Sequence, residues 1–345
     1  MPVISEAQVF LIHFLVASAV LIALLYYCFG PSCTYLIDFV CYLPPDYLRC
    51  PISKFIEHFE LTGFFERESI DLLEKVLERS GIGDEACVPI TLHELPPNSS
   101  FNPAREEIEE VLFTVVKDLL AKHKLSPKSI DILVSNCSIF CPTPAITDMI
   151  INKFGLRSNV KSISLSGMGC SAGVLSVSLA KELLKVHKNS LALVLSAEAV
   201  TPNGYLGKRK SMLISNTIFR MGGAALLLSN RKHDKQTAKY KLVHLIRTHM
   251  GSDDKCYSCV MQHADEDGNI GVSLSKELLQ VAANALKINL LELGPRVLPY
   301  SEQLLYLRWV ICRQMWHAAG QEETYVPNFK KYHIYFAKSI VSIRV

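Results

Sequence analysis

The residue whose surroundings most suggest covalent chemistry is Cys170, in the stretch SISLSGMGCSAGVLS at 162–176. A short apolar run precedes this cysteine and a helical pattern follows it, so the sequence predicts a strand-to-helix turn there. The first turn of a helix carries unpaired N–H groups and partial positive charge, which favour the nucleophilic thiolate. Gly167, Gly169 and Gly173 would let a bulky thioester approach the sulfur, although glycines serve a tight turn equally well. A nucleophile and a buried structural cysteine are therefore both open interpretations.

The elements that would position Cys170 alternate between strand and helix. This alternation predicts an α/β domain around a largely buried sheet. Beyond a polar bridge at 230–240 the pattern restarts with a strand candidate at 240–250, but few strand candidates follow. The other strand candidates are residues 130–136, 160–167, 190–200 and 222–230, and the helix candidates are 69–80, 104–122, 144–155, 171–187 and 272–293.

The N-terminal segment differs from the rest of the chain in charge. Residues 9–29 carry no formal charge, and a helix over them would span roughly 31 Å, about one hydrocarbon core. A basic start and a small-residue cleavage site are missing, which argues against a signal peptide. We therefore expect a retained membrane anchor at 1–32, with Arg49 and Lys54 beyond it placing the rest of the chain on the cytosolic side. The aromatic residues and prolines of 34–51 are expected to lie at the membrane interface.

Composition narrows the classes of function. The net charge is +3, without a dense basic stripe, which argues against a nucleic-acid partner. The 11 cysteines are scattered, as is typical of free thiols in a reducing compartment. Cys256 and Cys259 form a CxxC motif without a second pair or suitably spaced histidines, so no metal site is expected. No cofactor is expected either, because phosphate-loop and dinucleotide-binding glycine patterns are missing. The basic cluster at 208–210 suits either CoA phosphates or a solvated loop.

Several motifs resemble those of plant 3-ketoacyl-CoA synthases, the condensing enzymes of very-long-chain fatty acid elongation. They are GMGCSAG around Cys170 and, in chain order, YLIDFVCYLPPD, VLERSGIGDEACVP, NCSIFCPTPAITDMIINKFGLR, FRMGGAALLLSN, RTHMGSDDKCYSCV and GVSLSKELL. The resemblance covers residues 33–330. It implies a thiolase-like fold of two related α/β halves, a complete first half at 91–235 and a partial second half at 236–345, after a juxtamembrane segment at 33–90.

The resemblance also implies a reaction, a decarboxylating Claisen condensation. Cys170 would take the acyl group of a long-chain acyl-CoA as a thioester, and the carbanion formed when malonyl-CoA loses CO₂ would attack that thioester. His249, in RTHMGSDD, matches a histidine-bearing stretch of the family and is the second candidate site residue. The family further implies the endoplasmic reticulum membrane as location, with a homodimer or elongase-complex partners and no metal or redox cofactor.

Near its C-terminus the sequence departs from the family it resembles. Related condensing enzymes use a histidine and an asparagine to stabilise the negative charge on the malonyl thioester oxygen. Segments like HFCIHAGG and GNTSSSS do not follow YVPNFKK at 325–331, and neither His317 nor His333 fits them by order or by neighbouring glycines. Two hypotheses result. The chain is a 3-ketoacyl-CoA synthase that uses Cys170, or it is a catalytically impaired, C-terminally truncated paralogue that serves as a membrane-bound scaffold or dimer partner.

Overall fold

The computed structural model describes residues 16–18, 20–21, 33–315 and 340–344. The chain divides into two units, Met1–Cys33 and Thr34–Val345. Most of the expected membrane anchor, including 16 of the 21 residues of its span at 9–29, lies outside the described residues. Within the described part of the chain, no helix is both long enough and apolar enough to cross a bilayer.

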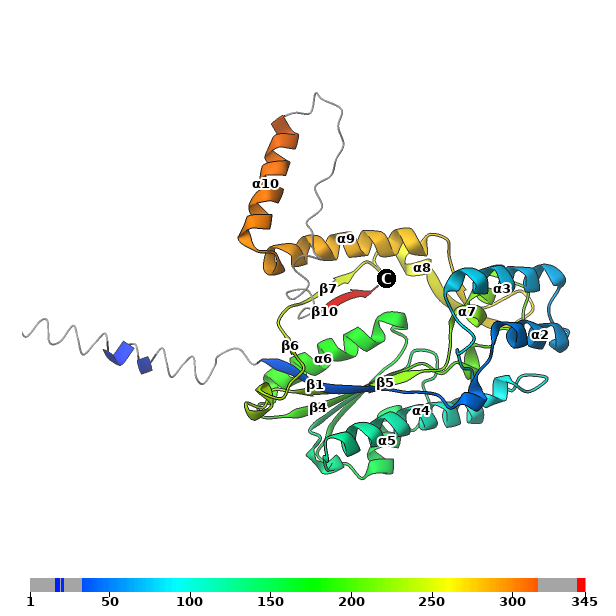
Figure 1. Ribbon diagram of the computed structural model, residues 1–345, viewed down its shortest axis with the longest axis horizontal. Coiled ribbons are helices and arrows are strands. Elements are labelled where there is room, and N and C mark those ends of the chain that lie inside the picture. The colour runs from blue at the N-terminus through cyan, green and yellow to red at the C-terminus, as the bar shows by residue number, and fades with distance from the viewer. Residues whose placement is uncertain (1–15, 19, 22–32, 316–339, 345) are drawn as a thin grey trace, which may run out of the picture. The chain divides into compact units, whose positions relative to one another are not determined.

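A six-stranded mixed sheet with the order β3-β2-β4-β5-β1-β6 forms the centre of the larger unit (Figure 1). β2 runs parallel to β3 and β4, whereas β5 is antiparallel to β4, and β1 is antiparallel to β5 and β6. The strands are β1 Thr34–Cys41, β2 Ile132–Asn136, β3 Lys161–Leu165, β4 Leu191–Ala197, β5 Gly223–Ser229 and β6 Tyr240–Leu242. The predicted α/β architecture and the strands expected between residues 130 and 230 are confirmed.

Helices cover both faces of this sheet, which is why β2 and β4 are buried along nearly their whole length (Figure 1). α6 lies on one face, where Val177, Ala180 and Leu184 pack against the buried side chains of β2 and β4. α4 and α5 lie on the other face. The helices of this part are α2 Ile52–Thr62, α3 Arg67–Ser80, α4 Phe101–Lys122, α5 Ile146–Phe154, α6 Ala172–Val186 and α7 Lys210–Ile218. The helices predicted at 69–80, 104–122, 144–155 and 171–187 are therefore confirmed.

The expectation that residues 34–51 lie at a membrane interface is wrong for their first part. Thr34–Cys41 forms β1, which lies between β5 and β6 in the central sheet. Tyr35 and Ile37 are buried there. Aromatic residues suit a buried strand as well as a membrane interface, and the pairing that decides between them joins residues far apart in the sequence.

A charged residue, Asp38, is buried in β1 because basic side chains surround it. Lys122 Nζ lies 2.7 Å and His123 Nε2 2.9 Å from its carboxylate, and Lys239 contacts it as well. Burial by itself would raise the pKa of Asp38, but the hydrogen bonds from Lys122 and Lys239 hold that pKa well below its usual range. β1 is thereby tied to the end of α4 and to the chain just before β6.

The single strand predicted at 240–250 is instead two strands that belong to different sheets. β6 ends at Leu242 in the central sheet, and β7, Leu245–His249, pairs in parallel with β10, Ile340–Arg344. The helix predicted at 272–293 begins later than expected because its first residues lie in β9. The remaining elements are α8 Asp254–Ser258, β8 Val260–Ala264, β9 Ile270–Leu274, α9 Leu278–Val297 and α10 Tyr300–Met315. The division into two thiolase-like halves near residue 235 stays a prediction.

Candidate functional site

Cys170 lies beyond the carboxyl end of β3, in a single 3₁₀ turn, Gly169–Ser171, that leads directly into α6. Gly167 and Gly169 both have a φ of 63°, a backbone conformation that side chains disfavour, and this conformation turns the chain from strand to helix. The Cys170 residue is exposed. The predicted strand-to-helix turn is confirmed and the alternative of a buried cysteine is wrong, whereas the role of nucleophile stays a prediction.

The start of α6 is fixed by hydrogen bonds to the ends of β2 and β4. The buried Asn136 amide donates to Ser176 Oγ at 2.9 Å and to the Leu195 carbonyl at 3.1 Å. Its Oδ1 accepts from Ser196 Oγ at 3.1 Å. A Cβ added to Gly173 would lie 2.9 Å from Ser196 Oγ, so this glycine lets α6 approach β4 closely. The helix that begins after Cys170 is thus held against the parallel strands, whose carboxyl ends are the usual ligand edge of such sheets.

A second set of hydrogen bonds joins Glu198, just after β4, to the backbone next to the thiol. The Glu198 carboxylate accepts from the N–H groups of Ser138 at 2.8 Å and Ile139 at 3.3 Å. Ser138 Oγ in turn donates to the Gly169 carbonyl at 3.3 Å. Burial and the Glu198 charge raise the pKa of the nearby Cys137 thiol to about 12. Cys137 is therefore a neutral, buried thiol, and of these two cysteines only Cys170, which is exposed on the turn before α6, suits nucleophilic chemistry.

The second predicted site residue, His249, lies at the end of β7 and is exposed. Its Nδ1 accepts a hydrogen bond from the Gly251 N–H at 3.2 Å. A Cβ at Gly251 would lie 2.7 Å from His249 Cε1, so the glycine leaves room for the imidazole to fold back over the turn. Among the described residues no hydrogen bond joins His249 to Cys170, and its role in a site stays a prediction. His317 and His333 lie outside the described residues.

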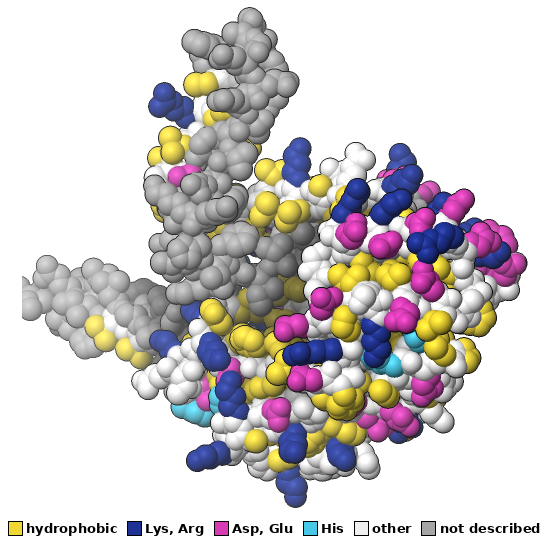
Figure 2. All heavy atoms as spheres, turned by 45° about the vertical axis from the view of Figure 1, so that its right-hand side comes forward, with side chains coloured by type: hydrophobic (Ala, Val, Ile, Leu, Met, Phe, Trp, Pro, Cys, Tyr) yellow, Lys and Arg dark blue, Asp and Glu magenta, His cyan; other side chains and the backbone are white. Residues whose placement is uncertain are grey.

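The predicted basic cluster at 208–210 makes ion pairs with acidic side chains rather than standing alone. Figure 2 shows basic and acidic side chains interspersed over the face that carries α2 and α3, without a continuous basic patch. The cluster therefore fits the solvated-loop interpretation in this structure. The pairs are Lys208–Glu66 at 2.7 Å, Arg209–Glu266 at 2.5 Å and Lys210–Glu68 at 3.6 Å.

The CxxC motif packs as a pair of small apolar residues. Cys256 and Cys259 are buried together with Val281 of α9. In the part of the chain that the structure describes, no three His, Cys, Asp or Glu side chains gather in a way that could hold a metal ion.

A cavity that the sequence did not predict lies beside α2, and we call it the α2 cavity. It has a volume of about 700 Å³, part of which is open to solvent. Aromatic residues at helical spacing in α2, Phe55 and Phe59, were the sequence signal that could have pointed to it. Its walls come from two segments far apart in the chain, and the lining residues are Cys50, Lys54, Phe55, His58, Phe59, Thr62, Phe65, Val88, Leu92, His93, Pro97, Val200, Asn203, Gly204, Tyr205, Leu206, Ser215, Asn216 and Phe219.

Comparison with known proteins connects this fold to one family. Residues 27–315 match the family model described as FAE1/Type III polyketide synthase-like protein. The chain is 65% identical over 322 residues to 3-ketoacyl-CoA synthase 7 of Arabidopsis thaliana, covering 92% of this chain and 69% of the relative. It is 47% identical over 333 residues to 3-ketoacyl-CoA synthase 5 of the same plant, covering 96% of this chain and 67% of the relative.

A solved structure shows the same fold at low sequence identity. 1,3,6,8-Tetrahydroxynaphthalene synthase from Streptomyces coelicolor A3(2), a bacterial type III polyketide synthase, is 18% identical with a TM-score of 0.62, covering 75% of this chain and 73% of that chain. The fold is thus that of the thiolase-like type III polyketide synthases, with a mixed α/β sheet. Together with the matches to named synthases, it shows that the chain belongs to the plant 3-ketoacyl-CoA synthase family, the acyltransferase-type condensing enzymes of fatty acid elongation.

Proposed function

We propose that Cys170 is the residue on which this condensing enzyme carries its acyl group. The Cys170 thiolate attacks the carbonyl carbon of a long-chain acyl-CoA, and the CoA thiolate leaves. Malonyl-CoA then loses CO₂, and the resulting carbanion attacks the thioester carbonyl and expels the Cys170 thiolate. The product is a 3-ketoacyl-CoA two carbons longer than the starting acyl group, and the enzyme returns to its initial state.

The observation that carries this proposal is the placement of an exposed thiol on the turn that leads into α6. The neighbouring Cys137 thiol is buried beside Glu198 and held neutral. Of these two cysteines, therefore, only Cys170 can be reached by an acyl-CoA.

We further propose that residues 9–29 anchor the chain in the endoplasmic reticulum membrane, with the larger unit on the cytosolic side. The uncharged length of this segment supports the anchor, and the basic residues that follow it support the orientation. A homodimer or contact with other elongation enzymes is proposed from the family alone. His249 is proposed as a further site residue because its stretch matches the family at that position.

The test uses microsomes from cells that express the full chain, supplied with palmitoyl-CoA and radiolabelled malonyl-CoA. We expect labelled 3-ketoacyl product and acyl label on the protein, with both lost at least about a thousandfold in Cys170→Ala. Cys141→Ala is the matched control. Cys141 is also exposed, and it lies shortly after Ser138, whose side chain donates to the carbonyl of Gly169 beside Cys170. Unchanged condensation in Cys170→Ala would contradict the proposal. Acylation of Cys170 without condensation would favour the impaired paralogue.

A further inference from the structure

Asn136, the last residue of β2, is a polar side chain buried where two strands and a helix meet. Only 2% of Asn136 is exposed. Its amide donates to Ser176 Oγ at 2.9 Å and to the Leu195 carbonyl at 3.1 Å, and Ser196 Oγ lies 3.1 Å from its oxygen. The side chain therefore joins the carboxyl ends of two parallel strands to the helix that follows Cys170.

The direction of each hydrogen bond in this group follows from the partners. The Leu195 carbonyl can only accept, so the amide atom of Asn136 that faces it is the nitrogen. The amide oxygen therefore accepts from the Ser196 hydroxyl. Ser176 Oγ accepts from the amide and uses its own proton to donate to the Ala172 carbonyl at 2.9 Å. The result is one directed series of hydrogen bonds, which we call the Asn136 network: Ser196, Asn136, Ser176 and Ala172.

The Asn136 network ends in the first turn of α6. Ala172 is the first residue of that helix and comes shortly after Cys170 in the chain. Ser196 also lies where a Cβ of Gly173 would be only 2.9 Å away, so the network and this glycine fix the same turn against β4. The thiol of Cys170 is exposed, and its place therefore depends on the backbone that carries it.

An apolar residue at position 136 would fill the same space without needing any hydrogen bond. Burying an amide is unfavourable unless its hydrogen bonds are made, and a leucine of similar volume has none to make. A fully paired polar network, however, holds its members in one geometry, because a displacement leaves a buried polar atom without its partner. The Asn136 network is therefore better suited to fixing the position of the first turn of α6 than to stabilising the fold.

We propose that Asn136 is a positioning residue for the reaction at Cys170. Through Ser176 it fixes the first turn of α6, and with it the place of the thiol relative to the carbonyl carbon of a bound acyl-CoA. This inference rests on the proposed function, since it takes Cys170 as the residue that carries the acyl group. Misplacing a reacting group by about 1 Å can slow a reaction about a hundredfold, so a small shift of the turn should slow the attack without weakening binding.

The test measures acylation of Cys170 in a single turnover, with the full chain in microsomes and radiolabelled palmitoyl-CoA. Asn136→Leu should lower the maximal acylation rate per folded molecule at least about tenfold, and the palmitoyl-CoA concentration at half-maximal rate should stay within about twofold. Folded molecules are counted by their resistance to protease. Alkylation of Cys170 by iodoacetamide should be unchanged, because a small reagent needs no defined direction of approach.

Ser176→Ala and Ser135→Ala form a matched pair of milder variants. Both serines are fully buried, and each substitution removes one hydrogen-bonded hydroxyl, so the two losses of stability should be similar. Ser176 links Asn136 to Ala172, whereas Ser135 pairs with Ser164 of β3 at 3.1 Å. Only Ser176→Ala should slow acylation, by about threefold or more, because it alone cuts the Asn136 network.

A variant without the polar side chains of the Asn136 network separates position from stability. In the triple variant Asn136→Leu, Ser176→Ala, Ser196→Ala, no side chain of the network is left without its partner, so stability should recover while acylation stays slow. The inference is overturned if Asn136→Leu or Ser176→Ala acylates at the rate of Ser135→Ala, or if the triple variant recovers its rate together with its stability. Cys170→Ala decides the proposed function separately, because it must abolish acylation whether or not Asn136 positions the turn.

Discussion

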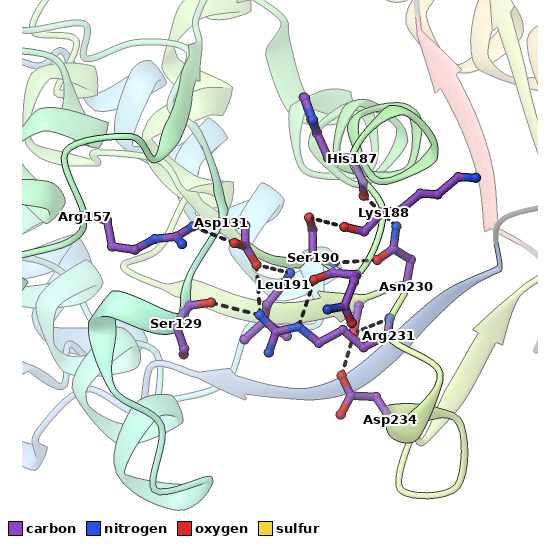
Figure 3. Close-up of polar contacts among 12 residues, drawn as sticks. Ser129, Asp131, Arg157, His187, Lys188, Ser190, Leu191, Asn230, Arg231 and Asp234 are labelled. Carbon is purple, nitrogen blue, oxygen red and sulfur yellow. Dashed lines mark hydrogen bonds and ion pairs between the residues drawn. The ribbon is translucent and has the colours of Figure 1, made fainter.

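The amino ends of β2 and β4 and their carboxyl ends are held by different kinds of interaction. At the amino ends, the Asp131 carboxylate accepts from Arg157 at 2.5 Å, from Arg231 at 2.9 Å and from the Leu191 N–H at 2.7 Å (Figure 3). These contacts join the starts of β2 and β4 to the chain after β5 and to the loop before β3. One carboxylate therefore connects four segments of the fold.

The end of α6 is joined to the same edge through Asn230 (Figure 3). The Asn230 amide oxygen accepts from the Ser190 N–H at 2.7 Å, and its nitrogen donates to the His187 carbonyl at 2.7 Å and to the Leu184 carbonyl. The strand start and the helix end cannot separate without breaking this bridge.

At the carboxyl ends, by contrast, the thiol of Cys170 is exposed, and the turn that carries it rests on the 3.3 Å contact from Ser138 to Gly169. The Glu198 carboxylate accepts there from the backbone N–H groups of Ser138 and Ile139 rather than from basic side chains. On the proposed function, the paired charges therefore lie at the end of the strands opposite to the acyl-carrying thiol. The proposed nucleophile is left accessible, and the turn that carries it is supported from behind.

The largest effect on stability should come from the amino ends. Asp131→Ala removes the carboxylate that pairs with Arg157, Arg231 and the Leu191 N–H. It should lower the free energy of unfolding by about 3 kcal/mol. The loss is smaller than for a fully buried ion pair because both arginines are partly exposed. Denaturant unfolding measures this change, and condensation per folded molecule should stay the same. Asp118→Ala, at an exposed position of α4, should change stability by no more than about 0.5 kcal/mol. Equal losses in both variants would remove the contrast between the two ends.

At the carboxyl ends a change should affect rate more than stability. Glu198→Gln replaces charge-assisted hydrogen bonds to the 138–139 backbone with weaker neutral ones, and should slow acylation of Cys170 about tenfold while lowering stability by less than about 1 kcal/mol. Loss of the charge should also lower the pKa of Cys137, which a thiol titration detects. Glu182→Gln, on the exposed face of α6, is the control. An unchanged acylation rate would show that Glu198 does not position the turn.

The smallest expected effect is a dependence of stability on pH that arises at the α2 cavity. Burial lowers the pKa of His58 and of His93 below the ordinary value of 6.5. At pH values between the lowered pKa values of the folded chain and 6.5, the unfolded chain binds more protons than the folded chain. The free energy of unfolding should therefore rise with pH through this window and fall on acidification. Both rings are half-buried, so the total should stay below about 1 kcal/mol. Melting curves from pH 5 to 7.5 should flatten in the His58→Phe, His93→Phe double variant, and an unchanged slope would contradict this assignment.

The sequence predicted correctly the elements that form through interactions between residues close together in the chain. The turn at Cys170 was predictable because its glycines, the preceding strand and the following helix are neighbours in the sequence. The split of residues 240–250 into two strands was not, because the break at Val243 and His244 contains no glycine or proline.

The features that the sequence did not predict depend on contacts between residues far apart in the chain. β1 was taken for a membrane-interface segment because its partners, such as Ser229 opposite Tyr35, come much later in the chain. The α2 cavity was missed for the same reason, since its walls come from residues 50–97 and 200–219. Neither segment alone shows a pattern that specifies a cavity, although the motifs of both resemble one family.

The place of β1 in the sheet also sets the order in which the protein can be completed during translation. β1 is synthesised first among the strands of the described residues, but its neighbours β5 and β6 begin only at Gly223 and Tyr240. At about 5–20 residues per second, the nascent chain carries this strand without neighbours for on the order of ten seconds or more. An uncovered strand invites pairing with other chains. A ribosome that stalls before codon 223 therefore leaves a product in need of a chaperone.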